Sequence, residues 1–113
     1  MDDCLFCKIS RGELNTAFRH EDDQCVAFDD IHPKAPAHVL IVPKTHLASI
    51  AEMGEGDTQL VGHLHLVAKT LAESLGIAEN GYRLIFNTRA DGGQEVSHLH
   101  LHLLGGQRLG GMV

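Results

Sequence analysis

The most regular pattern of apolar and polar residues occupies the middle of the chain. Across residues 57–75, apolar side chains recur at steps of three and four, the spacing that gathers them on one face of an α-helix. We therefore expect a helix here, capped at its start by Asp57 and ended near Gly76. The apolar positions are Leu60, Val61, Leu64, Val67, Ala68, Leu71 and Leu75.

Shorter apolar or alternating runs, each bounded by turn-forming residues, predict strands. The strands are expected at residues 17–20, 24–28, 38–42, 82–87 and 98–104. A further run at residues 6–14 predicts a short helix broken near Gly12. No repeat or linker interrupts this order, so we expect one domain over residues 1–113. The predicted fold class is α+β, an antiparallel sheet of about five strands with the long helix against one face and a short N-terminal helix.

The last predicted strand carries the most unusual pattern, the motif HLHLHLL over residues 98–104. Because side chains alternate between the two faces of a strand, the three histidines share one face at steps of ~6.6–7 Å, and the leucines share the other. Imidazole is a nucleophile, an acid or base near neutral pH, a phosphate donor and a metal ligand. The motif therefore indicates a metal site or phosphate chemistry, which can coexist; the alternative is an ordinary strand with solvent-facing histidines.

Composition and charge narrow the possible functions. The chain has 113 residues, of which 43% are hydrophobic, enough for one core. Nine Lys and Arg stand against fifteen Asp and Glu, for a net charge of −6, and no basic run could neutralise a row of phosphates, so nucleic-acid binding is disfavoured. No apolar run approaches the ~20 residues that span a bilayer, and the N-terminus is acidic where a signal peptide would be basic. We expect a soluble, cytoplasmic protein without a membrane partner.

The chain has three cysteines, an odd number that argues against a framework of disulfides. Cys4 and Cys7 form a CxxC pair, which in a reducing compartment suggests metal or redox chemistry. Thioredoxin-type redox pairs follow a strand, and no strand is predicted before Cys4, so metal binding is favoured; the other alternative is a free pair of thiols. Cys25 lies in the apolar run CVAF and is expected to pack as a small hydrophobic residue.

The motif at residues 98–104 resembles the His-φ-His-φ-His-φ-φ signature, with φ apolar, of the histidine triad nucleotide-binding (HIT) family. Nearly the whole chain takes part in the resemblance, through the stretches AFDDIHPKAPAHVLIVPKTH, YRLIFN, DGGQEV and LHLLGG. These stretches are similar to the Hint branch, the adenosine phosphoramidases, in its bacterial form with an N-terminal CxxC. The Fhit branch, which hydrolyses dinucleoside polyphosphates, typically lacks the Gly-Gly pair that follows the motif.

The resemblance implies a hydrolase that cleaves purine nucleoside 5'-phosphoramidates through a covalent nucleotidyl-histidine. The middle histidine of the motif, His100, would be the nucleophile, and a neutral imidazole can attack through Nε2 if its Nδ1–H is held by a backbone carbonyl. His102 would contact the phosphate and assist the leaving group. Two alternatives remain, a dinucleoside polyphosphate hydrolase and a zinc-bearing nucleotide-binding module without turnover.

The resemblance also implies a set of nucleotide-binding residues. Asp30 would accept hydrogen bonds from both ribose hydroxyls, Asn87 would hold the phosphate and sugar, and Gln94 with the loop amides after it would contact the phosphate. The implied apolar walls of the base slot are Phe6, Phe28 and Ile31, with Leu5 beside them. Animal relatives often have Ser after the glutamine; here Glu95 stands in its place, and a carboxylate repels phosphate, so only its backbone N–H carries over.

In bacterial relatives with the CxxC pair, a structural zinc is completed by the histidine of a PKxH stretch and the first histidine of the motif. The zinc ligands implied here are Cys4, Cys7, His46 and His98. A closed site of two cysteines and two histidines binds no water, so Zn²⁺ would staple the N-terminus to the sheet and would not activate a nucleophile.

The resemblance further implies a homodimer, formed by the long helix and a sheet edge. His63 and His65 lie two residues apart on the predicted helix and so point to different faces. We expect them at the surface or in the dimer contact and not as metal ligands. For His20, His32 and His38, the sequence offers no partner at a meaningful spacing.

Overall fold

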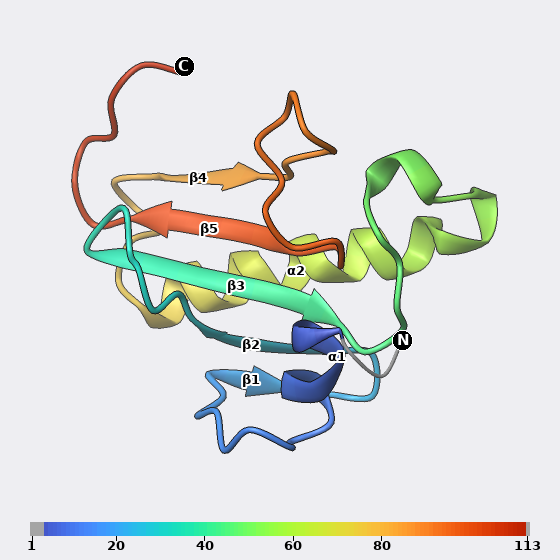
Figure 1. Ribbon diagram of the computed structural model, residues 1–113. Helices are drawn as coiled ribbons and strands as arrows, with labels where there is room; N and C mark the ends of the chain where they lie inside the picture. Colours follow the sequence, from blue (N-terminus) through green and yellow to red (C-terminus); the bar gives the residue numbers. More distant parts are fainter. Residues whose placement is uncertain (1–3, 113) are drawn as a thin grey trace.

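The computed structural model describes residues 4–112, in which five strands form one antiparallel sheet (Figure 1). The strands are β1 (His20–Glu21), β2 (Cys25–Asp29), β3 (Ala37–Pro43), β4 (Tyr82–Ile85) and β5 (Leu101–Gly105). Their order across the sheet is β1-β2-β3-β5-β4, so the long strand β3 lies in the centre and β1 and β4 form the edges.

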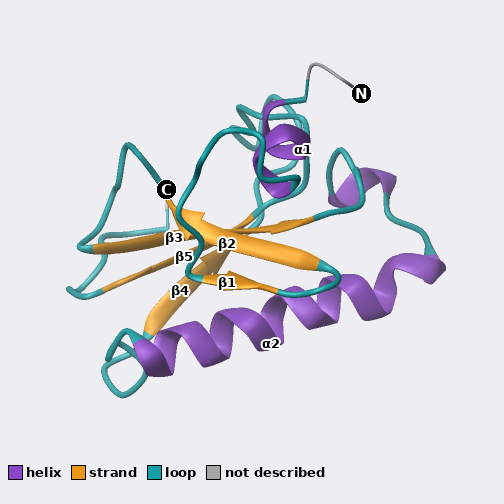
Figure 2. Cartoon of the chain, turned by 90° about the horizontal axis from the view of Figure 1, so that it is seen from below, coloured by secondary structure: helices purple, strands orange, loops and turns teal. Residues whose placement is uncertain are grey.

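Helices cover both faces of the sheet (Figure 2). The helix α2 (Thr58–Ser74) runs along one face, and α1 (Leu5–Ser10) lies on the other. Two short 3-10 helices, η1 (Ile50–Glu52) and η2 (Glu55–Asp57), precede α2 in the chain. This arrangement confirms the predicted fold class. Among the described residues, no helix combines the length and the apolar character needed to cross a membrane.

Each face of the sheet carries its own apolar core, because side chains alternate along the strands. The core under α2 includes Cys25, Ala27, Val39, Ile41, Leu64, Val67, Leu71, Leu99, Leu101 and Leu103. The core under α1 consists of Phe6, Ile9, Val26, Phe28, Leu40 and Val42. The leucines of the motif thus pack against α2, and the buried Cys25 packs there as the small hydrophobic residue that was predicted.

The last strand begins three residues later than predicted, at Leu101, which pairs with Ile41 of β3. The residues just before Leu101 are hydrogen-bonded to the loop after β3 and not to β3 itself: the backbone N–H of Leu99 donates to the carbonyl of Leu47 at 2.6 Å. Pro43 ends β3, and a proline has no N–H with which to extend the ladder. His98 and His100 therefore precede the ladder.

Other element boundaries also differ from the sequence prediction. The first helix ends at Ser10, and Gly12 follows with a φ of +78°, a conformation that glycine adopts without steric cost. Asp57 directly precedes α2 as predicted, but its carboxylate accepts the backbone N–H of Gly54 at 2.9 Å and does not cap α2. The first strand lies at residues 20–21 and not at 17–20, and β4 ends at residue 85 and not at 87.

Candidate functional site

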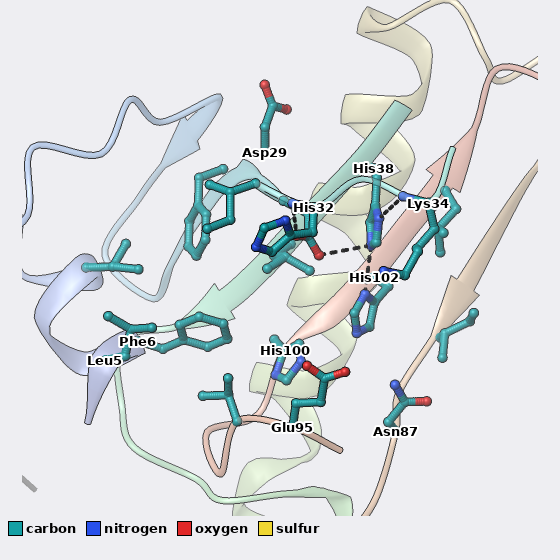
Figure 3. Close-up of a pocket in the computed structure, with 18 of the residues that line it drawn as sticks. Leu5, Phe6, Asp29, His32, Lys34, His38, Asn87, Glu95, His100 and His102 are labelled. Carbon is teal, nitrogen blue, oxygen red and sulfur yellow. Dashed lines mark hydrogen bonds and ion pairs between the residues drawn. The ribbon is translucent and has the colours of Figure 1, made fainter. Parts of the chain in front are cut away.

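A pocket of about 530 Å³ opens on the sheet face that carries α1 (Figure 3). Its walls come from α1, the loop between β2 and β3, the end of β4, the glycine-rich loop after β4, and β5. Seven of the eight residues predicted for catalysis and nucleotide binding line this pocket: Phe6, Phe28, Asp30, Ile31, Asn87, His100 and His102. The eighth, Gln94, does not.

One end of the pocket is an apolar slot with a carboxylate beside it. The rings of Phe6 and Phe28 meet edge to face with their centroids 5.7 Å apart, and Ile31, 86% exposed, contributes an apolar side chain from the β2–β3 loop. In the same loop, Oδ1 of Asp30 accepts the backbone N–H of His32 at 2.9 Å. Such a slot can hold a planar ring between apolar walls, with an acceptor for hydroxyl groups at its side.

The imidazole of His100 is held in one tautomer by a hydrogen bond to the backbone. Its Nδ1 donates to the carbonyl oxygen of His98 at 2.7 Å. Since a neutral imidazole carries only one N–H, Nε2 keeps a free lone pair. The ring is 8% exposed, lines the pocket and contacts the edge of Phe6, with ring centroids 5.1 Å apart. His100 therefore lines the pocket with a largely buried ring whose Nε2 has a free lone pair.

His102 receives the opposite tautomer through His38. The backbone N–H of Lys34 donates to Nδ1 of His38 at 3.0 Å, so the proton of neutral His38 is on Nε2. That Nε2 lies 2.9 Å from Nδ1 of His102 and donates to it, which leaves the proton of His102 on its own Nε2. This second Nε2 is buried and has no hydrogen-bond partner among the described residues. His102 thus carries an unpaired N–H donor in a pocket where His100 carries a lone pair.

The role of His38 was not found from the sequence, where no spacing connects it to another residue. In the sheet His38 stands opposite Leu104 of β5, two positions along from the pair of Leu40 with His102. Only this register brings its ring to 5.2 Å from that of His102, measured between centroids. The one signal in the sequence is that His38 has the same parity as Leu40 and Val42 and so shares their face.

Burial keeps both histidines of this pair neutral. It lowers the pKa of His102 to about 4, with further contributions from His100 and His38. It also lowers the pKa of His38, although Asp30, whose Oδ2 lies 3.5 Å from Nε2 of His38, opposes that shift. At neutral pH His38 and His102 are therefore neutral in the free pocket, and an anion bound beside them would favour their protonation.

Gln94 serves the glycine-rich loop and does not line the pocket. Its Nε2 donates to the carbonyls of Ala48 at 2.7 Å and Val96 at 2.9 Å, and its Oε1 accepts the backbone N–H of Arg89 at 2.8 Å. Both polar groups of this side chain are therefore hydrogen-bonded within the protein, and its contact with a nucleotide stays a prediction. The adjacent Glu95 does line the pocket, near His100 (Figure 3).

The close approach of the backbone at Gly92 shapes the same loop. A side chain at Gly92 would lie 2.5 Å from the carbonyl oxygen of Thr88, which is too close for any Cβ atom. Gly93 has a φ of +79° and lines the pocket. The two glycines let the loop fold tightly enough to bring its backbone to the mouth of the pocket.

The four residues implied as zinc ligands lie together beside the pocket. Nδ1 of His98 is 3.2 Å from Sγ of Cys4, 3.4 Å from Sγ of Cys7 and 3.2 Å from Nδ1 of His46. Around a tetrahedral Zn²⁺ with bonds of about 2.0–2.3 Å, ligand atoms stand about 3.3–3.8 Å apart. The mutual distances of these donors are close to that range.

Hydrogen bonding also prepares His98 to bind a metal. Its Nε2–H donates to the carbonyl of Pro43 at 2.8 Å, which leaves the lone pair on the Nδ1 that faces the sulfurs. In addition, burial and the neighbouring Cys4 raise the pKa of the Cys7 thiol, as expected for two sulfurs that need a cation between them to ionise together. The donor set therefore fits a structural metal ion.

The five-stranded antiparallel sheet thus carries, on the face with α1, a pocket that is lined by His100 and His102. Comparison with known proteins gives the family. The HIT domain model matches residues 11–109, and the chain belongs to this family. The family predicted from the histidine motif is thereby confirmed.

The relatives agree with the predicted enzyme class. The chain is 45% identical over 112 residues to a purine nucleoside phosphoramidase of Escherichia coli, covering 99% of this chain and 94% of the relative. A HIT family hydrolase from Legionella pneumophila superposes with a TM-score of 0.92 at 49% identity, covering 94% and 95% of the two chains. A histidine triad protein from Clostridium difficile superposes with a TM-score of 0.96 at 42% identity, covering 100% and 98%.

The low pKa of His102 predicts how stability depends on pH. Because this pKa is about 4 in the folded protein against an ordinary 6.5, the unfolded chain binds the proton first as pH falls. The stability contributed by neutral His102 is complete above pH 6.5 and is lost progressively toward pH 4. Denaturant unfolding between these pH values should therefore show a smaller loss of stability for His102→Gln than for the wild type. Parallel curves for the two proteins would contradict the assignment.

Proposed function

We propose that the protein hydrolyses purine nucleoside 5'-phosphoramidates, releasing an amine and a nucleoside 5'-monophosphate. The observation that carries this proposal is the pairing of tautomers in one pocket. His100 offers the lone pair of Nε2, and His102 offers the N–H of its Nε2. A nucleophile beside a hydrogen-bond donor is what the transfer of a nucleotidyl group requires. The relative from Escherichia coli bears the name of this activity.

In the first step, Nε2 of His100 attacks the α-phosphorus and the bond from phosphorus to the leaving nitrogen breaks. The positive charge that develops on the His100 ring is stabilised by the carbonyl of His98, which accepts its Nδ1–H. The bound phosphate favours protonation of His102, which then gives the leaving amine its proton. Oδ2 of Asp30 lies 3.5 Å from Nε2 of His38 and offers that N–H a second acceptor while His102 is protonated.

In the second step, water attacks the same phosphorus and the bond to Nε2 of His100 breaks. His102, now neutral, accepts the proton that the water loses, and it releases one proton to solvent when the monophosphate leaves, which balances the proton it took up when the substrate bound, so both imidazoles return to their neutral starting states. The net reaction consumes one water and yields the amine and the monophosphate. Each histidine thus needs the tautomer that its own hydrogen bond provides.

The remaining pocket residues would position the nucleotide. We place the purine in the slot of Phe6, Phe28 and Ile31, with the ribose hydroxyls on Asp30 and the phosphate side near Asn87. Gln94 takes the role of a positioning residue for the glycine-rich loop, since its amide is engaged there. The proposal favours turnover over the alternative of a binding module, because a module that only binds needs no nucleophile.

Replacing the proposed nucleophile tests the function directly. We expect His100→Ala to lower kcat on adenosine 5'-phosphoramidate by at least about a thousandfold, the scale on which removal of a covalent nucleophile acts. Binding of adenosine monophosphate, measured by calorimetry, should persist and shows that the pocket is still folded. A wild type that binds the monophosphate without turnover would favour the binding module, and an active His100→Ala would exclude this nucleophile.

We further propose that Cys4, Cys7, His46 and His98 hold a structural Zn²⁺. Bound there, the ion would supply a fixed link between α1, the loop after β3 and the segment before β5, and no catalytic chemistry. His98 is also the residue whose carbonyl orients His100, so this link would steady the nucleophile. Two thiolates persist only in a reducing environment, which supports a cytoplasmic location.

The zinc proposal predicts the metal content of the purified protein. When both proteins are prepared without chelator, Cys7→Ser should contain one Zn²⁺ per chain fewer than the wild type. Its Tm should also be lower, because metal binding stabilises only the folded state. Inductively coupled plasma analysis and thermal unfolding measure the two effects. Equal zinc content in both proteins would refute the site.

We also propose that two copies of the chain pair as a homodimer through β4 and α2. In the sheet order, β4 is an edge strand, and Leu66 on α2 is 64% exposed. An open strand edge and an exposed apolar side chain are both features typical of a surface that another chain covers.

A charge at Leu66 should weaken that pairing. Sedimentation velocity is expected to give twice the chain mass for the wild type and a shift toward the monomer for Leu66→Glu, because the glutamate would have to be buried unpaired. Circular dichroism of the variant checks that the fold is unchanged. A wild type that sediments as a monomer would overturn the proposal.

A further inference from the structure

A second cluster of metal-ligating side chains lies at the β1 edge of the sheet, away from the pocket. It consists of His20, Asp22, Cys25 and His63, which we call the β1-edge cluster. They come from β1, the turn after it, β2 and α2. Each offers one ligand atom, and these four atoms all lie within 4.8 Å of one another. None of the four lines the pocket or belongs to the Cys4/Cys7 site.

Asp22 is the centre of the β1-edge cluster and uses its two oxygens differently. Oδ1 accepts the backbone N–H groups of Gln24 at 2.7 Å and Cys25 at 2.9 Å, which fixes the turn between β1 and β2. Oδ2 is free of the backbone and receives Nε2 of His20 and Nε2 of His63, each at 2.7 Å. The turn therefore uses only Oδ1 of Asp22, and Oδ2 is hydrogen-bonded to two imidazoles, one from β1 and one from α2.

Cys25 is the fourth member of the β1-edge cluster and contributes a sulfur atom. Its Sγ lies 3.7 Å from Oδ2 of Asp22, and its side chain is fully buried. In a tetrahedral Zn²⁺ site, a sulfur and an oxygen ligand stand about 3.5 Å apart and two nitrogen or oxygen ligands about 3.3 Å apart. Sγ of Cys25 already stands near the required distance from Oδ2 of Asp22, and each imidazole nitrogen would have to move away from that oxygen by about half an ångström.

The chemistry of these donors suits zinc better than other common ions. Imidazole and thiolate ligands favour Zn²⁺ over Mg²⁺ or Ca²⁺, which prefer sets of oxygens. The partly exposed side chains of His20, Asp22 and His63, 31%, 27% and 28% accessible, give an ion a way in. Burial and Asp22 raise the pKa of the Cys25 thiol to about 12, so the ion must displace the proton of this thiol.

We propose that His20, Asp22, Cys25 and His63 form a second Zn²⁺ site, which clamps the β1–β2 hairpin onto α2. The site is separate from the catalytic pocket and from the proposed zinc at Cys4 and Cys7. It joins an edge strand of only two residues to the longest helix of the protein. Its effect is therefore on stability and metal content and not on the reaction.

The substitution Asp22→Asn tests the site while preserving the turn. The amide oxygen of asparagine can accept the N–H groups of Gln24 and Cys25 as Oδ1 does now, whereas the anionic ligand is lost. Protein as purified would be incubated with excess Zn²⁺, desalted and analysed for zinc. We expect one Zn²⁺ per chain fewer in Asp22→Asn than in the wild type, and the same loss in His63→Ala.

His65→Ala is the matched control, because His65 lies on the same helix but its ring contacts Phe86, on the β4 side. It should keep the zinc content of the wild type. Equal zinc in the wild type, Asp22→Asn and His63→Ala would overturn the second site and leave an Asp22 turn that two histidines stabilise. A loss in His65→Ala as large as that in His63→Ala would also overturn it, since binding would then not depend on the cluster.

A spectroscopic arm tests the sulfur ligand. After zinc has filled the proposed site at Cys4 and Cys7, added Co²⁺ should produce a thiolate-to-cobalt charge-transfer band in the wild type. This band should be absent from Cys25→Ala. The apparent Kd for Co²⁺ should rise by about tenfold or more in Asp22→Asn. A charge-transfer band of equal strength in Cys25→Ala would exclude this sulfur and overturn the four-ligand site. Because every arm compares variants of the β1-edge cluster with the Cys4 and Cys7 site unchanged, the outcome does not depend on the proposed hydrolase activity.

Discussion

The carbonyl oxygen of His98 is the group on which the geometry of the pocket depends. It accepts the Nδ1–H of His100 and so decides which nitrogen of that ring carries the lone pair. His98 is itself held from two sides, since Nε2 donates to Pro43 and Nδ1 faces Cys4 and Cys7. The N-terminal segment, the end of β3 and the orientation of the nucleophile are therefore parts of one connected structure.

A second chain of hydrogen bonds enters the pocket from the opposite direction. It starts at the backbone N–H of Lys34, passes through the ring of His38 and ends at His102. Each series of hydrogen bonds begins at a backbone group that can act only as a donor or only as an acceptor. Each series therefore fixes the tautomer of the imidazole at its end. Two chemically identical side chains, His100 and His102, thus acquire opposite properties, a lone pair and an N–H, without any difference in charge.

The two faces of the sheet divide structure from chemistry. The face under α2 is an apolar core into which Leu99, Leu101 and Leu103 pack. The other face carries a smaller core under α1, and the pocket opens on this same face (Figure 3). The loops around the pocket supply much of its lining, whereas the sheet and α2 hold them in place, which is the usual division between functional loops and rigid elements.

Features that depend on residues close together in the chain are predictable from the amino-acid pattern. The alternation of histidine and leucine placed the leucines in the core and periodicity located α2. The motif, together with the other stretches that resemble the HIT family, identified the family and seven of the residues that line the pocket. The tertiary structure alone decided the pairings over long separations. These are His38 with His102, the engagement of Gln94 within its loop, the late start of β5, and the meeting of His63 with Asp22. The physical reason is that a side chain's face follows from local backbone geometry, whereas its hydrogen-bond partner follows from strand register and packing, which only the folded chain defines.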